Sequence, residues 1–133
     1  MLDISNSTMV IEPLKVLDTE IGEIKIYDNL IIMEGKEDSL FSFRTGIFIL
    51  LNLISQVGIR PVVYISNRVN NYSVDPNDYK YLEMIPNLKG IAVVSYSDWA
   101  KNAAKLEKRF YKKPFETFGS LDEAKEWASS LLE

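Results

Sequence analysis

The residue types most able to do chemistry gather in one polar stretch that follows an apolar run. This stretch, at 66–73, lies between a predicted strand and a predicted helix and contains Ser66, Asn67, Arg68, Asn70, Asn71, Tyr72 and Ser73. Ligands of open α/β sheets tend to lie at the carboxyl ends of strands, and a helix N-terminus with an arginine beside it suits an anion. The alternative, which is the commoner use of asparagine, is that these residues only form turns by bonding their own backbone.

The residues that follow this stretch are better explained as a helix start. Asp75 suits the N-cap, Pro76 suits the first helical position, and the acid Asp78 suits the positive end of the helix dipole. A calcium loop would need a glycine at its sharp turn and a glutamate at its twelfth position, and this segment has neither. We therefore expect a short helix carrying Tyr79, Leu82 and Met84 that ends before Pro86.

Another candidate is an arginine in an otherwise apolar predicted helix. At about 100° per residue, Arg44 lies between the main apolar stripe of that helix and a second stripe made by Phe41 and Phe48. A wide apolar face with one arginine can line a ligand cleft or a subunit contact. The interpretation we favour is that the arginine extends to solvent and pairs with a nearby carboxylate.

The composition excludes several kinds of chemistry. The chain has no cysteine and no histidine, so it offers no disulfide, thiolate nucleophile, zinc–thiolate site or histidine-dependent catalytic triad. An enzyme that uses carboxylates or lysine is left as a minor alternative, because no paired acids stand out in an apolar setting. We expect no catalytic residue, no metal ligand and no cofactor.

The charge balance argues against polyanionic partners. The net charge is −4, whereas a sequence-independent nucleic-acid binder or a protein docked on anionic lipid needs a basic surface. Cations near a helix C-terminus are favourable on their own, which explains the charged cluster Lys105, Glu107, Lys108, Arg109, Lys112 and Lys113. We expect no binding to nucleic acid.

The N-terminal residues and the longest apolar stretch both lack the features of a membrane signal. The N-terminal residues lack the basic and apolar regions of a signal peptide. The longest apolar stretch, at 46–54, is too short to span a bilayer and contains Asn52. We expect a cytoplasmic, bacterial protein with no integral membrane association.

Hydrophobic periodicity and cap signals predict a single α/β domain over residues 1–133. Its elements follow the order β-β-α-β-α-β-α-β-α, a mixed sheet of about five strands with four helices. We expect strands at 22–27, 30–33, 60–65, 90–95 and 115–118, and helices that start at 38 or 39, 75, 97 and 120. The first two strands form a hairpin through Asp28-Asn29, and Gly58 ends the first helix.

Three helices carry apolar stripes that we expect to face the sheet. The first stripe is Leu40, Phe43, Ile47, Leu50, Leu51 and Ile54; the second is Trp99, Ala103, Leu106 and Phe110; the third is Leu121, Ala124, Ala128 and Leu131, with Trp127 beside it. The strands at 60–65 and 90–95 do not alternate, which predicts that helices cover both of their faces.

Two parts of the sequence carry a family resemblance. They are GIAVVS at 90–95 and the ending WAKNAAKLEKRFYKKPFETFGSLDEAKEWASSLL, in which a helix leads into a strand and then into a capped helix. Together with the order of elements, they resemble the SpoIIAA-like proteins, which are described as STAS/CRAL-TRIO-like domains. The resemblance covers nearly the whole chain.

The resemblance implies a module rather than an enzyme. STAS domains are similar to anti-sigma-factor antagonists, which are switched by phosphorylation of a serine at the start of the helix after a central strand. Their pattern there is an aspartate followed by paired serines and a glycine, whereas this chain has Ser66-Asn67-Arg68 and then Asp75-Pro76, with Ser66 and Ser73 as the nearby hydroxyls. The CRAL-TRIO side implies a small apolar or lipid ligand, which would suit Phe41 and Phe48.

We therefore expect a non-enzymatic STAS-like regulatory or protein-interaction module. It would form a homodimer or contact another protein through the face that carries Phe41, Phe48 and Ile49. The alternative is a binder of a small apolar or lipid ligand, in a cleft between the helix predicted at 39–57 and the stretch at 66–73.

Overall fold

The computed structural model of the chain describes residues 12–38, 40, 41, 46, 49, 52–54 and 58–133. Arg44 and Phe48 lie outside the described residues, as does the side chain of Phe41. The candidates from the first apolar helix therefore stay predictions.

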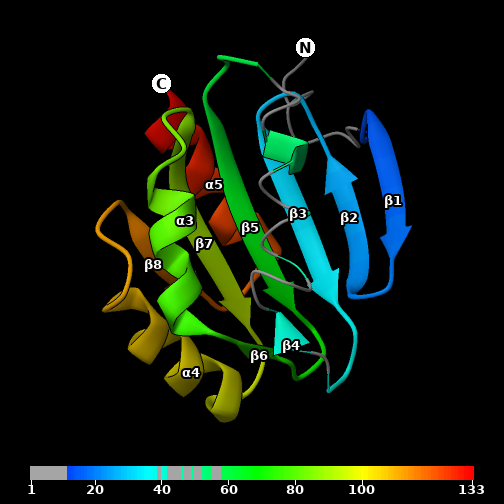
Figure 1. Ribbon diagram of the computed structural model, residues 1–133, viewed down its shortest axis with the longest axis vertical. Coiled ribbons are helices and arrows are strands. Elements are labelled where there is room, and N and C mark those ends of the chain that lie inside the picture. Colours follow the sequence, from blue (N-terminus) through cyan, green and yellow to red (C-terminus); the bar gives the residue numbers. More distant parts are fainter. Residues whose placement is uncertain (1–11, 39, 42–45, 47–48, 50–51, 55–57) are drawn as a thin grey trace.

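A six-stranded mixed sheet forms the centre of the described part of the chain (Figure 1). Its order is β1-β2-β3-β5-β7-β8, with β1 at Lys15–Thr19, β2 at Gly22–Ile26, β3 at Leu30–Gly35, β5 at Val62–Arg68, β7 at Leu88–Ser95 and β8 at Phe115–Phe118. The first three strands are antiparallel neighbours, whereas β3, β5, β7 and β8 run parallel. The predicted mixed α/β class is confirmed, and the structure adds β1 as an edge strand.

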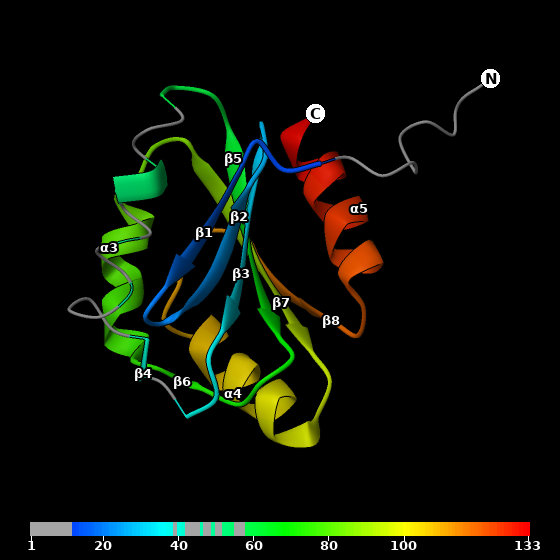
Figure 2. The same ribbon diagram turned by 90° about the vertical axis from the view of Figure 1, so that its right-hand side faces the viewer.

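Helices cover both faces of this sheet, as Figure 2 shows. One face carries α4 (Asp98–Lys108) and α3 (Tyr79–Glu83), which follows the 3-10 turn η2 (Pro76–Asp78), and the other carries α5 (Leu121–Leu132). Residues 49 and 52–54 are also helical, and Ile54 is fully buried in the core that includes α3 and α4.

The central strand β5 is buried along its whole length. Its side chains alternate between the two faces: Val62 and Tyr64 lie in the core under α3 and α4, whereas Val63 and Ile65 lie in the core under α5. The prediction that this strand is covered on both sides is confirmed, and the strand runs three residues further than predicted, to Arg68.

Turn chemistry accounts for one further prediction that the structure confirms. The two-residue turn Asp28-Asn29 joins β2 to β3, and the Tyr27 N–H donates to the Leu30 carbonyl at 2.8 Å. Gly58 has φ +74° with open space around it, a left-handed conformation that glycine adopts without strain. Residues 55–57 lie outside the described residues, so the end of the first helix at Gly58 stays a prediction.

The predicted helix start at Asp38 or Ser39 is wrong. Asp38 has φ +60°, and the next described residues, Leu40–Phe41, form the short strand β4, which pairs in parallel with β6 at Ser73–Val74. The Asp38 N–H donates to the Asn71 carbonyl at 2.8 Å. Backbone bonds to a distant segment therefore override the local cap signal, and Leu40 is exposed rather than inward.

The inward face of α4 differs from the prediction. Trp99 and Leu106 are 50% and 52% exposed, and Phe110, just after the helix, is 41% exposed. The buried residues are Ala100, Ala104 and Glu107, which share one helix face at intervals of four and three. Two alanines let the helix approach β7 and β8 closely, and the third position is occupied by a carboxylate.

The other predicted helix starts are confirmed, although α3 ends at Glu83, so that Met84 follows the helix and is 77% exposed. Asp75 caps η2 by accepting a hydrogen bond from the Asn77 N–H, and Ser97 and Ser120 cap α4 and α5 in the same way. Ala124 and Ala128 of α5 are buried, with Leu121, Trp127 and Leu131 packed against the same core.

We expect Ile65→Ala to lower the free energy of unfolding by about 2–5 kcal/mol, because it deletes fully buried methylenes and leaves a cavity. The matched control is Ile59→Ala. Because Ile59 is 96% exposed, this change should lower the free energy of unfolding only slightly. Urea unfolding monitored by circular dichroism measures both, and similar losses in the two variants would contradict the assignment of β5 to the core.

Candidate functional site

A buried ion pair joins the end of β5 to α4. Arg68 and Glu107 are 3% and 4% exposed. The Arg68 guanidinium donates from Nη1 to Glu107 Oε2 at 2.7 Å and from Nη2 to Glu107 Oε1 at 2.6 Å. This two-point geometry is the strongest that an arginine and a carboxylate form.

Three hydroxyl groups complete the network around the pair. The Tyr79 hydroxyl, from α3, donates to Glu107 Oε1 at 2.6 Å, and Arg68 Nε donates to Ser66 Oγ at 3.0 Å. Ser66 Oγ also bonds the Tyr72 hydroxyl, and the guanidinium carbon lies 5.4 Å from the centre of the Tyr72 ring. Because a buried charge is tolerated only when it is paired and hydrogen-bonded, these bonds are what allow Arg68 and Glu107 to lie inside.

The network shifts the ionisation of its members. Burial, above all, raises the pKa of Tyr72 and raises that of Tyr79 well above its ordinary value. Burial alone would lower the pKa of Arg68. Its hydrogen bonds to Glu107, together with electrostatic interactions with Tyr72, Tyr79 and Glu107, raise that pKa well above the ordinary value. The arginine therefore stays charged and the tyrosines stay neutral near neutral pH.

A close approach between two segments brings Tyr72 into this network. A Cβ on Gly35 would lie 2.6 Å from the Tyr72 ring, so only glycine lets the 69–72 loop lie against the end of β3. Asn70 Nδ2 donates to the Gly35 carbonyl at 3.1 Å, and the Asn71 N–H donates to the Glu37 carboxylate at 3.3 Å. Asn70 thus fixes the loop through a side-chain bond to a distant segment, and Asn71 does so through its backbone groups.

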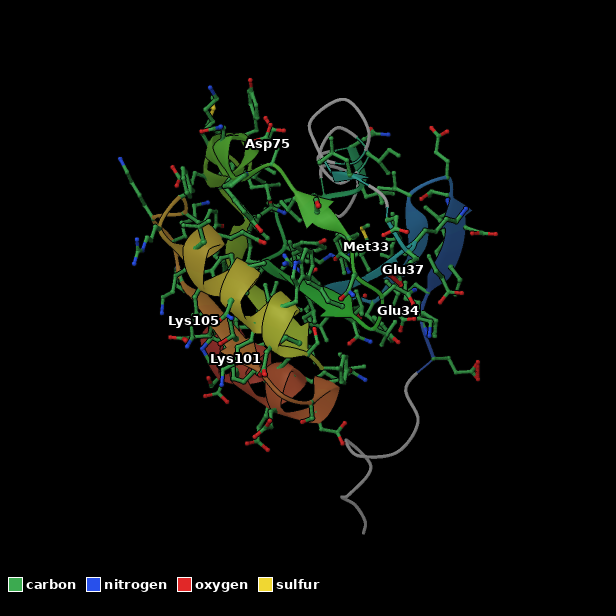
Figure 3. All side chains as sticks on the ribbon, turned by 90° about the horizontal axis from the view of Figure 1, so that it is seen from below. Met33, Glu34, Glu37, Asp75, Lys101 and Lys105 are labelled. Carbon is green, nitrogen blue, oxygen red and sulfur yellow. The ribbon has the colours of Figure 1, made fainter. Side chains whose placement is uncertain are left out.

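Asn67 lies on the opposite face of the sheet from Ser66 and Arg68, as strand alternation requires. Its Nδ2 donates to Glu34 Oε2 at 3.0 Å, and its Oδ1 accepts from the Tyr96 hydroxyl at 2.7 Å. Glu34 lies beside Met33 and Glu37 at the carboxyl end of β3 (Figure 3). This bond set links β3, β5 and the residue after β7.

The predicted 66–73 loop therefore does not exist as one unit. Ser66, Asn67 and Arg68 belong to β5, Asn70 and Asn71 to an exposed loop, and Ser73 to β6. The structure brings Ser66, Arg68 and Tyr72 together in the interior and leaves Asn67 on the far face. The Arg68 charge is neutralised by Glu107, so it is not open to an anion.

The sequence pattern placed Glu107 in the charged cluster near the C-terminus of α4. In the structure Glu107 is buried and lies at the centre of this network. A usable signal was present, because Ala100, Ala104 and Glu107 recur at helical spacing on one face. Small apolar residues at two of three such positions indicate a buried face, and an acid on that face needs a buried cation.

An open cleft of about 870 Å³ lies elsewhere, at the carboxyl ends of β7 and β8. Its lining residues are Ser95, Tyr96, Ser97, Asp98, Lys101, Thr117, Phe118 and Gly119. The Ser97 hydroxyl is already used as the cap of α4.

The described residues contain neither a metal site nor a membrane-spanning helix. The part of the chain that the structure describes contains no group of three histidine, cysteine, aspartate or glutamate side chains placed to hold a metal ion. Within that same part, every helix is too short or too polar to cross a lipid bilayer.

Comparison with solved structures identifies the fold as SpoIIAA-like. A crystal structure of an uncharacterised protein of the DUF3478 family with a SpoIIAA-like fold, from Shewanella loihica PV-4, matches with a TM-score of 0.52. The match covers 86% of this chain and 90% of that one, at 11% sequence identity. No protein-family model matches the sequence, and no curated protein matches it. The predicted fold is confirmed, and an identity this low carries the fold alone.

We expect Glu107→Gln to lower the free energy of unfolding by about 3–5 kcal/mol, because it leaves the buried Arg68 charge uncompensated. The control is Glu116→Gln, which removes the carboxylate of a half-exposed pair with Lys108 and should cost less than about 1 kcal/mol. Urea unfolding checks both.

A double variant distinguishes pairing from packing. The double variant Arg68→Met/Glu107→Leu removes both charges, so no unpaired charge stays buried. We therefore expect it to be more stable than either single variant. Additive losses from the two single changes would mean that the side chains contribute independently, and the pair would then not be the stabilising unit.

We expect the protein to lose stability in alkaline solution. Burial raises the pKa of Tyr64, Tyr72, Tyr79 and Tyr111, whereas a tyrosine in the unfolded chain ionises at about pH 10. Above that pH the unfolded state loses protons that the folded state keeps, so the contribution of these tyrosines to stability is constant below about pH 10 and is lost as pH rises toward the folded-state values. Urea midpoints at increasing pH measure this, and a midpoint that stays flat would contradict it.

Proposed function

We propose that this chain is a non-enzymatic protein-interaction module that uses an apolar stripe on α4. We define the α4 stripe as Trp99, Ala103, Leu106 and Phe110. The observation that carries the proposal is that three large apolar side chains are each about half exposed, Trp99 and Leu106 on α4 and Phe110 in the turn that follows it. Large apolar side chains gathered on a surface are typical of contact sites, and tryptophan in particular is enriched among residues that dominate binding energy.

The absence of enzyme activity is part of the proposal, and two observations support it. The chain has no histidine or cysteine. The buried Glu107 carboxylate is 4% exposed, and both of its oxygens already accept bonds from Arg68 and Tyr79, so it has no position open to a substrate.

A phosphoswitch of the STAS type is not part of the proposed function. Ser66 is 2% exposed, and its hydroxyl bonds Arg68 and Tyr72, so a kinase would reach it only after local unfolding. Ser73 is exposed but lies in β6 rather than at a helix start. A regulatory role would therefore act through contacts on α4.

The α4 stripe takes the place of the face predicted from the sequence. Ile49, the described member of that face, packs against the core beside α3 and α4. The small apolar or lipid ligand stays a second candidate, and no observation in the described residues favours it. The cleft at β7 and β8 lies at a different place from the one predicted and is lined largely by polar residues.

We expect Leu106→Glu to abolish capture of partners by the immobilised protein, because it places a charge in the middle of the α4 stripe. The matched control is Leu14→Glu, a change of the same type at an exposed leucine beside the edge strand β1. Proteins retained from an extract of the source cells by the unchanged chain and by Leu14→Glu should be lost with Leu106→Glu. Binding of each purified candidate should then weaken by about tenfold or more.

Retention of the same proteins by all three chains would contradict the use of the α4 stripe. Circular dichroism and urea unfolding of both variants must match those of the unchanged chain, so that lost capture reflects the surface and not the fold.

A further inference from the structure

We propose that the α4 stripe packs against the α4 stripe of a second copy of this chain, with the two helices antiparallel about a twofold axis. This deepens the proposed function and rests on it, because it names the occupant of the same surface. Three observations on the described residues support it: spacing, size and charge.

The spacing of the α4 stripe is that of a helix–helix seam. Its members follow each other at intervals of four, three and four residues, the alternation with which seam positions recur in paired helices. The series begins at Trp99, because Tyr96 precedes the N-cap Ser97 and its hydroxyl bonds Asn67. A second helix is therefore a partner whose shape fits this surface.

The stripe is complementary to itself in side-chain size. A twofold axis midway between Ala103 and Leu106 places Trp99 opposite Phe110 of the second copy, and Ala103 opposite Leu106 of the second copy. The space above the small alanine is then filled by the leucine, and this occurs twice by symmetry. A parallel pairing would instead place alanine on alanine and tryptophan on tryptophan.

Charge favours the antiparallel direction. Asp98 and Arg109 lie on the same side of the stripe, about 80–100° around the helix from Trp99, and at its opposite ends. Antiparallel pairing brings Asp98 beside Arg109 of the second copy, twice, whereas parallel pairing would leave these residues of the two copies on opposite sides of the seam. The antiparallel direction also aligns the two helix dipoles favourably.

The lysines of α4 do not oppose this contact. Lys101 and Lys105 lie about 200° and 240° around the helix from Trp99, and Figure 3 shows both on the side of α4 turned away from Met33 and Glu34. Lys108 is directed to Glu116 of β8. The basic residues therefore stay outside the seam.

The apolar area of the stripe is smaller than that of a stable dimer interface. The exposed parts of Trp99, Leu106 and Phe110 amount to roughly 100 Å² each, or about 600 Å² for two copies. Stable interfaces bury about 1,200 Å² or more, so the polar flanks must contribute the rest. We therefore expect a reversible dimer whose share falls on dilution.

The test is sedimentation velocity of the purified chain over a wide range of protein concentration. The unchanged chain and Leu14→Glu should show a monomer–dimer equilibrium, and Leu106→Glu should weaken it by at least about tenfold. Asp98→Arg and Arg109→Asp should each weaken the dimer several-fold, because each sets like charges side by side. The double variant Asp98→Arg/Arg109→Asp should restore it, which a merely structural role of either residue would not do.

Each other outcome overturns the inference. A dimer that Leu106→Glu leaves intact uses another surface, and a double variant that stays weak rules out the antiparallel direction. A chain that is monomeric throughout has a different occupant on the stripe, either a protein or a lipid surface. Capture experiments then separate the two proposals, because Leu106-dependent binding of another protein would keep the interaction module. Leu106-dependent binding to phosphatidylserine vesicles would contradict both the interaction module and the dimer. The absence of any Leu106-dependent binding would contradict both as well.

Discussion

The buried pair of Arg68 and Glu107 fixes how α4 is rotated, and the surface of that side of the molecule follows from it. The two residues are 39 positions apart and form two hydrogen bonds. Turning α4 about its axis would break both bonds and leave a charge unpaired in the interior, which costs several kcal/mol. The rotation that keeps them together is the one that turns Trp99, Leu106 and Phe110 outward. The same pair that stabilises the interior therefore creates the exposed stripe.

The residues around the pair serve the fold first. Ser66 and Tyr72 satisfy the arginine, Tyr79 satisfies the carboxylate, and Gly35 makes room for the Tyr72 ring. Every member comes from a different part of the chain except Ser66 and Arg68, so the network ties β3, β5, α3 and α4 into one unit. Polar residues at the end of a central strand are often functional. Here Ser66 and Arg68 form bonds with Tyr72 and Glu107, and these bonds connect β5 to the following loop and to α4.

Much of the fold could be predicted because its signals are local. The hairpin at Asp28-Asn29, the buried run of β5 and the caps Ser97 and Ser120 depend on neighbours a few residues away. The candidate site could not be predicted in the same way. Local hydrophobicity favoured the larger stripe of α4 as its inner face, whereas a long-range ion pair selected the smaller one. Likewise, backbone bonds between the 37–41 and 71–74 segments outweighed a helix cap at Asp38.

The exposed stripe is itself an energetic argument for a partner. Leaving about 100 Å² of apolar surface in water at each of three side chains forgoes roughly 7 kcal/mol of burial at about 25 cal/mol per Å². That is of the same order as the cost of breaking the buried pair, so the pair holds this rotation of α4 together with other contacts. The close approach of Ala100 and Ala104 to the sheet is one further cause. A partner that covers the stripe would recover this free energy, because the apolar surface that the single chain leaves in water is buried in the complex.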